Sequence, residues 1–233
     1  MLAFDALVLA THDASLAAGA LRSIGAEGAS DAASAAQEQQ QLKSLADALQ
    51  AQRDHGTAPV FSWSGVFPAG TSDALPFDAV CVPGSAVVQF LYRSASKPGR
   101  PALEDGGELW TAVSTPAFAA ELLRREGPAA EAQKGDSDRG GGAALAATNL
   151  MASEVSALLA GGGAPPKPLR AVAKRWGAGF AAGSLQHGHH CIALPPWQLA
   201  IAGDFVCARD SPTEAAALSG LAAGETIALS IAT

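Results

Sequence analysis

Gly203 and Asp204 stand directly after the apolar run Trp197–Ala202, which is typical of a buried strand. A glycine at a strand end permits close approach to the backbone, and a carboxylate accepts hydrogen bonds from ribose or ribityl hydroxyl groups. The pair therefore predicts either an ordinary turn or a place where backbone and carboxylate meet the sugar-phosphate part of a cofactor.

A helix is predicted to begin a few residues later. Ser211 and Glu214 have the S-x-x-E spacing of a capping box, and Pro212 stands at the first helical position. The N-terminus of a helix offers unpaired N–H groups and the positive end of the helix dipole. Together with Asp204, it could bind an electron-rich ring or a pyrophosphate. The alternative is that Asp204 only ends a strand and Ser211 only caps a helix.

A second group of reactive side chains lies within five consecutive positions. His187, His189, His190 and Cys191 are all potential ligands of zinc or copper. Ligands so close together rarely all reach one tetrahedral ion, and no further cluster stands nearby in the sequence. A polar loop is therefore the favoured interpretation, and we predict no metal site.

Other candidates have a functional and a structural interpretation each. Trp176 and Trp197 could wall a flavin pocket, although packing in a core is favoured. Four cations could steer an anion such as a nicotinamide dinucleotide phosphate, although solvated surface positions are favoured: Lys97, Arg100, Lys174 and Arg175. Neither the G-x-S-x-G turn that carries a serine nucleophile nor a Walker loop occurs, so serine hydrolases and P-loop enzymes are not indicated.

The composition limits the class of protein. The 233 residues are 48% hydrophobic, which suffices for one sizeable core or two small lobes. The net charge is −7 without a basic stripe, so no nucleic-acid partner is expected. No apolar run reaches the roughly 18 residues of a membrane span. The three cysteines favour a soluble protein of a reducing compartment, cytoplasm or organelle stroma, with Cys81 and Cys207 buried in apolar runs.

The elements that must position these residues form a recognisable order. Each chain end is predicted to be a buried strand followed by a helix: Phe4–Thr11 with a helix capped by Asp13 or Ser15, and the strand before Asp204 with the final helix. Between them, turns separate short strand-like runs at 58–67, 77–82, 86–93 and 107–114, before a helix at 116–126 and a low-complexity insertion at 127–142.

This order predicts an α/β (α+β) protein. Residues 1–25 and 190–233 are expected to form one layer from both chain ends. An antiparallel or mixed β-sheet domain, residues 57–177, is expected to be inserted between them.

Several of these stretches resemble the flavin amine oxidases. The runs "AIAGDFV" (200–206) and "SPTEAAALSGLAAGETIA" (211–228) resemble the family's C-terminal motif, in which a strand ends in Ala-Gly-Asp and a small-residue helix packs below the flavin. Four further runs resemble the renalase-like branch in the expected order: "FDALVLAT", "YRSASKPGRP", "ELWTAVSTPAFAAELL" and "LRAVAKRW".

The resemblance implies an FAD-dependent oxidoreductase that transfers hydride to flavin from a small-molecule substrate, either an amine or a dihydronicotinamide of the NAD(P)H type. It implies that Gly203 and Asp204 hold the ribityl-phosphate region. It further implies that Thr213, Glu214 and Ala215 set backbone groups against the flavin ring, with the β-rich domain roofing the substrate pocket. It assigns no catalytic acid or base.

The sequence departs from the family at the expected dinucleotide fingerprint. The family opens with a strand and a G-x-G-x-x-G turn, whereas the nearest match here is "GAGFAA" (177–182), which no amphipathic helix follows. The expected Arg-Tyr after Trp176 is Gly177-Ala178. The chain is therefore interpreted as a C-terminal portion, with FAD partly bound or lost, or with a protein partner that supplies the missing half. The alternative is a non-catalytic remnant that acts as a scaffold or interaction subunit.

Overall fold

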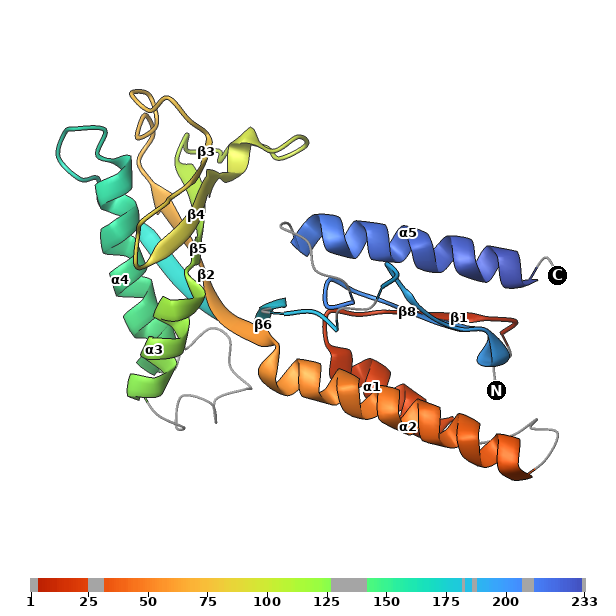
Figure 1. Cartoon of the computed structure of the whole chain (residues 1–233). Coiled ribbons are helices and arrows are strands. Elements are labelled where there is room, and N and C mark those ends of the chain that lie inside the picture. Colours follow the sequence, from red (N-terminus) through yellow and green to blue (C-terminus); the bar gives the residue numbers. More distant parts are fainter. Residues whose placement is uncertain are drawn as a thin grey trace. The chain divides into compact units, whose positions relative to one another are not determined.

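The chain folds into two compact units, one of which interrupts the other. The computed structural model describes residues 4–24, 32–126, 142–181, 183–185, 188–206 and 212–231. The split unit consists of Met1–Ala58 with Phe180–Thr233, and the inserted unit is Pro59–Gly179. Each unit combines helices with a β-sheet of its own, which confirms the predicted α/β class (Figure 1). The split unit also includes residues 26–56, which belonged to neither of the two predicted domains.

The split unit is built on a three-stranded sheet of order β1-β8-β7. β1 (Leu7–Ala10) and β8 (Leu199–Ala202) are parallel neighbours, with Leu7 opposite Leu199 and Ala10 opposite Ala202. β7 (Ile192–Leu194) is antiparallel to β8 and joined to it by the 3₁₀ helix Pro195–Trp197. The two chain ends thus form one sheet through a pairing of segments far apart in the sequence.

Helices lie on both faces of this sheet. α1 (Ala14–Ser23) and α2 (Ala32–His55) lie on one face, and α5 (Pro212–Ile231) lies on the other (Figure 1). The alternation of β8 explains this arrangement, because successive side chains point to opposite faces. Leu199 and Ile201 pack with α1 and α2, whereas Ala200 and Ala202 pack with α5.

β1 corrects one expectation from the sequence. Its apolar run was predicted to be a buried strand, but β1 lies at the sheet edge, where Leu7 is 49% exposed and Val8 37% exposed. A run that is apolar on both faces is typical of a central parallel strand. The pattern therefore identified a strand correctly but could not place it within the sheet.

The inserted unit contains a five-stranded sheet of order β3-β4-β5-β2-β6. The pairs β3–β4, β4–β5 and β5–β2 are antiparallel. The strands are β2 (Thr57–Phe67), β3 (Ala79–Cys81), β4 (Val88–Arg93), β5 (Glu108–Ser114) and β6 (Arg170–Ala181). A 3₁₀ turn, η1 (Ser94–Ser96), follows β4.

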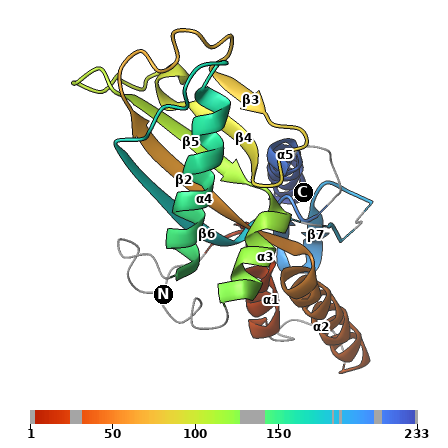
Figure 2. The same cartoon turned by 90° about the vertical axis from the view of Figure 1, so that its left-hand side faces the viewer.

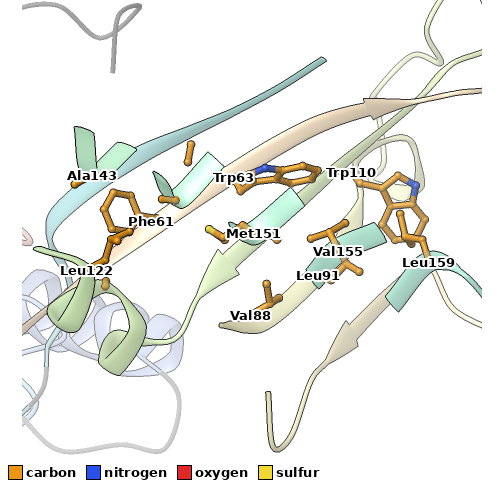
Figure 3. Close-up of a cluster of buried hydrophobic side chains, with 14 of the residues drawn as sticks. Phe61, Trp63, Val88, Leu91, Trp110, Leu122, Ala143, Met151, Val155 and Leu159 are labelled. Atoms are coloured by element: carbon orange, nitrogen blue, oxygen red, sulfur yellow. The ribbon is translucent and has the colours of Figure 1, made fainter. Parts of the chain in front are cut away.

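Two helices, α3 (Pro116–Glu126) and α4 (Gly142–Leu159), pack on one face of this sheet (Figure 2). Between them and the strands lies the unit's core, where Trp63, Met151 and Trp110 are fully buried (Figure 3). The Trp63 indole N–H donates to the carbonyl of Thr148, 3.1 Å away, which fixes α4 on β2. By length and hydropathy α4 passes the criteria for a membrane span, alone among the described helices. Its buried stripe against the sheet is the pattern of a core helix.

Two smaller expectations are also settled. Cys81 was predicted to be buried, but it is exposed, because β3 is an edge strand of only three residues. Cys191 is buried, and Cys207 lies outside the described residues. Of the low-complexity insertion, residues 127–141 also lie outside them, whereas Gly142 is already the first residue of α4.

Candidate functional site

The split unit contains a point at which its connections change face. β1 is followed by α1 on one face of the sheet, and the neighbouring parallel strand β8 is followed along the chain by α5 on the other face. In open α/β sheets, ligands bind in the crevice that such a divergence opens outside the carboxyl ends of the strands. The carboxyl ends of β1 and β8 are therefore the candidate functional site.

Thr11 and Gly203 meet at this edge. The Thr11 N–H donates to the carbonyl of Ala202 at 3.3 Å, so the ladder between β1 and β8 continues to the ends of both strands. His12 is exposed just beyond Thr11, and Asp204 is half-buried just beyond Gly203. The sequence predicted Gly203 and Asp204 here, but it did not predict that the residues after β1 lie beside them.

Gly203 is a close-packed position. A Cβ atom there would lie 2.7 Å from the Thr11 carbonyl oxygen and would collide with the ring of Phe205. Its N–H donates to the Ser219 hydroxyl at 3.0 Å, across to α5. Neighbouring groups of the chain itself therefore make the close approach that a glycine was expected to offer to a cofactor.

Asp204 is placed differently. Its carboxylate makes no hydrogen bond or ion pair with the residues that the structure describes, and it is half-buried. A carboxylate in this position can accept hydrogen bonds from hydroxyl groups of a bound molecule. Of the two predicted residues at the end of β8, Asp204 is therefore the one that offers an acceptor.

The start of α5 extends beyond the sheet. Ser219 contacts Gly203 at the strand end, and Thr213 lies six residues earlier, which is about 9 Å along the helix axis. Thr213 and Glu214 are exposed, whereas the Ala215 side chain is buried. The backbone N–H groups of Thr213 and Glu214 precede the first intrahelical hydrogen bond, whereas Ala215, the fourth residue of α5, is the first to donate within the helix. Ser211, the predicted cap, lies outside the described residues.

One further interaction at this edge, the ion pair of Asp13 with Arg53, was not predicted from the sequence. Asp13 caps α1 by accepting from the Ser15 N–H at 3.0 Å and from the Ser15 hydroxyl at 2.6 Å. Arg53 of α2 pairs with the same carboxylate at 3.2 Å. Asp13 was predicted as a cap, but its ion pair joins segments 40 residues apart, and no local pattern indicates such a contact.

The pKa of Asp13 makes this cap dependent on pH. Burial raises the pKa, but the hydrogen bonds from Ser15 and the positive charge of Arg53 outweigh it, so the pKa is lowered. A lowered pKa in the folded state stabilises the protein above the unfolded-state value of about 3.9 and ceases to do so as the pH falls through the folded-state value.

We therefore expect Asp13→Asn, which retains a capping oxygen, to lower the free energy of unfolding by no more than about 1 kcal/mol at pH 7, because the ion pair is partly solvated. The difference from the wild type should vanish below the folded-state pKa. Denaturant titrations of both proteins at several pH values measure it. A difference that persists unchanged into acid would show that the charge of Asp13 is not its cause.

The remaining candidates lie elsewhere. Trp197 is partly buried against the core formed by α1, α2 and β8, which is the structural role favoured from the sequence. Trp176 is 48% exposed on β6, in the inserted unit. Among the described residues, no group of three or more His, Cys, Asp or Glu side chains could hold a metal ion. His187, the first of the four potential ligands, lies outside those residues.

Comparisons with known proteins give no assignment of this site. No protein-family model matches the chain, and none of the curated proteins matches it. The geometry at the carboxyl ends of β1 and β8 is therefore the basis on which a function can be proposed.

Proposed function

We propose that the split unit is part of the cofactor-binding layer of an FAD-dependent oxidoreductase of the renalase and amine oxidase type. The observation that carries the proposal is the divergence of α1 and α5 from adjacent parallel strands, with Asp204 at the resulting crevice. Bound FAD would supply the hydride-accepting chemistry, with an amine or a dihydronicotinamide as the donor.

The residues present fit this cofactor in part. The Asp204 carboxylate is accessible to ribityl or ribose hydroxyl groups, and the start of α5 offers N–H groups and the positive end of a dipole. About 9 Å separate the two along the axis of α5, so a ligand in contact with both is elongated. Gly203 does not fit as a cradle, because its N–H and the space above its Cα are already used within the chain.

The role of each chain group follows from these positions. Asp204 would orient the cofactor by accepting hydrogen bonds, and Thr213 and Glu214 would present N–H groups where negative charge is stabilised, with Ala215 next to them in the first turn. The role of Gly203 would be to hold β8 against α5. No described residue is assigned as a general acid or base.

Binding of FAD by the full chain tests the proposal. We expect FAD fluorescence to be quenched on titration, and Asp204→Ala to weaken binding about tenfold, the effect of losing hydrogen bonds to a charged acceptor. Asp54→Ala, which removes an exposed carboxylate from α2, is the matched control and should bind as the wild type does. Bleaching of the bound flavin by an amine or by NADH under anaerobic conditions would then identify the donor.

The opposite result would favour the second candidate, a non-catalytic scaffold or interaction subunit. The observation in its favour is the internal use of Gly203, since packing alone explains why a glycine stands there. A wild-type protein that leaves FAD fluorescence unchanged would overturn the oxidoreductase proposal. Equal FAD affinity of Asp204→Ala and the wild type would remove Asp204 from the site.

A further inference from the structure

The face of the five-stranded sheet opposite α3 and α4, here called the open face, has a distinctive set of side chains. The strands alternate, so residues next to the buried core positions Trp63, Ala112 and Ala173 point to the open face. They include Ser62 and Ser64 of β2 and Thr111 of β5. Tyr92 of β4 lies opposite Thr111, and Lys174 and Trp176 come from β6. Neither α3 nor α4 packs there.

The charges on the open face have one sign. No aspartate or glutamate stands at an open-face position in β2 to β6, whereas Arg170 and Lys174 do on β6, and Lys97, from the segment after η1, lies over Tyr92 of β4. The whole chain has a net charge of −7. A locally positive surface on an acidic protein is complementary to an anionic partner.

Two of these cations are held by aromatic rings. The Lys97 ammonium lies 3.8 Å from the centroid of the Tyr92 ring, and the Lys174 ammonium lies 5.0 Å from that of Trp176. The Trp176 indole is itself fixed, because its N–H donates to the Ser62 hydroxyl at 2.8 Å. Each ring orients an ammonium group that would otherwise move freely.

Hydroxyl groups occupy the interval between the two pairs. The Thr111 hydroxyl lies 3.5 Å from that of Ser64 and 3.5 Å from that of Ser94. β4 and β6 are separated by β5 and β2, so the two lysine–aromatic pairs are about 14 Å apart at the usual strand spacing. A ligand that contacts both pairs therefore has separated negative charges with hydrogen-bonding groups between them.

We propose that the open face binds a linear acidic oligosaccharide. Sugar hydroxyl groups match the central serine and threonine hydroxyls, and carboxylates or sulfates of separate sugar units match the two lysines. A compact dianion is too short to reach both pairs. Single-stranded nucleic acid is the less favoured occupant, because an ammonium group already lies over one face of each of the rings Tyr92 and Trp176, which leaves at most the other face for base stacking.

Titration of the full chain with tetragalacturonate by calorimetry at low salt tests this site. We expect the wild type to bind tetragalacturonate with an affinity that falls as salt is added. Lys97→Gln and Lys174→Gln should each lower this affinity about fivefold. Tyr92→Leu keeps every charge but frees Lys97, and should cost about threefold. The double variant Lys43→Gln/Arg125→Gln removes the same charge from α2 and α3 and should bind as the wild type does.

Other probes separate the alternatives. Maltotetraose has the hydroxyl groups without the charges and should not bind, and oligothymidylate of equal charge should bind more weakly than tetragalacturonate. The proposal is overturned if the wild type ignores tetragalacturonate, or if Lys97→Gln/Lys174→Gln binds it as tightly as the control double variant. Tighter binding of oligothymidylate would replace the glycan by a nucleic acid. FAD affinity measured on Lys97→Gln/Lys174→Gln, and tetragalacturonate affinity measured on Asp204→Ala, distinguish failure of this proposal from failure of the proposed function.

Discussion

Replacing Gly203 by alanine is expected to destabilise the split unit by about 2–3 kcal/mol, near the upper end for overpacking a close-packed site. The added methyl group would lie 2.7 Å from the Thr11 carbonyl oxygen and would collide with the Phe205 ring. Phe205 is almost fully buried and Thr11 belongs to the β1–β8 ladder, so neither can retreat without breaking other contacts. Denaturant unfolding combined with amide hydrogen exchange of β8 and α5 measures the loss.

Gly220→Ala is the matched control. Gly220 lies on the exposed side of α5, and no atom lies within 4 Å of the position of an added Cβ. Alanine favours a helix interior over glycine, so this variant should be more stable by roughly 0.5–1 kcal/mol. If Gly203→Ala proves as stable as the wild type, β8 and α5 are not held together as described, and the explanation of Gly203 by internal packing fails.

Some of this site was accessible from the sequence. The strand before Asp204 and the helix after it follow from local signals, namely an apolar run that ends at Gly203 and a proline at the first position of α5. Local signals do not show which distant segment pairs with β8. The position of Thr11 next to Gly203 depends on a parallel pairing across nearly the whole chain, for which one sequence contains no signal.

The contact of Ser219 with the sheet could have been predicted from the sequence. Ser219 lies in the buried stripe of α5, between Ala215 and Ala223, and a hydroxyl in such a stripe needs a partner. That requirement predicts a hydrogen bond to the sheet beneath, which the Gly203 N–H provides. β1 and Cys81 failed for another reason, since an apolar run identifies a strand but cannot say whether a neighbour covers it.

In the inserted unit, the largest loss of stability is expected for Trp63→Ala, about 3–5 kcal/mol. Trp63 is fully buried between β2 and α4, and its ring fills the space left by Gly65. The substitution leaves a cavity and also deprives the Thr148 carbonyl of its donor. Trp63→Phe retains most of the volume and should lose only the smaller part due to the hydrogen bond, about 1–2 kcal/mol.

Val172→Ala is the control for Trp63→Ala, because it shortens a side chain of the same sheet at an exposed position. Val172 lies on β6 and is 56% exposed, so its truncation should change the free energy of unfolding by less than about 1 kcal/mol. Hydrogen exchange of α4 amides reports on each variant, because α4 is the helix that Trp63 fixes to the sheet. If Trp63→Ala leaves α4 protection no lower than Val172→Ala does, the helix is held by its alanine and methionine contacts alone and the indole is not its anchor.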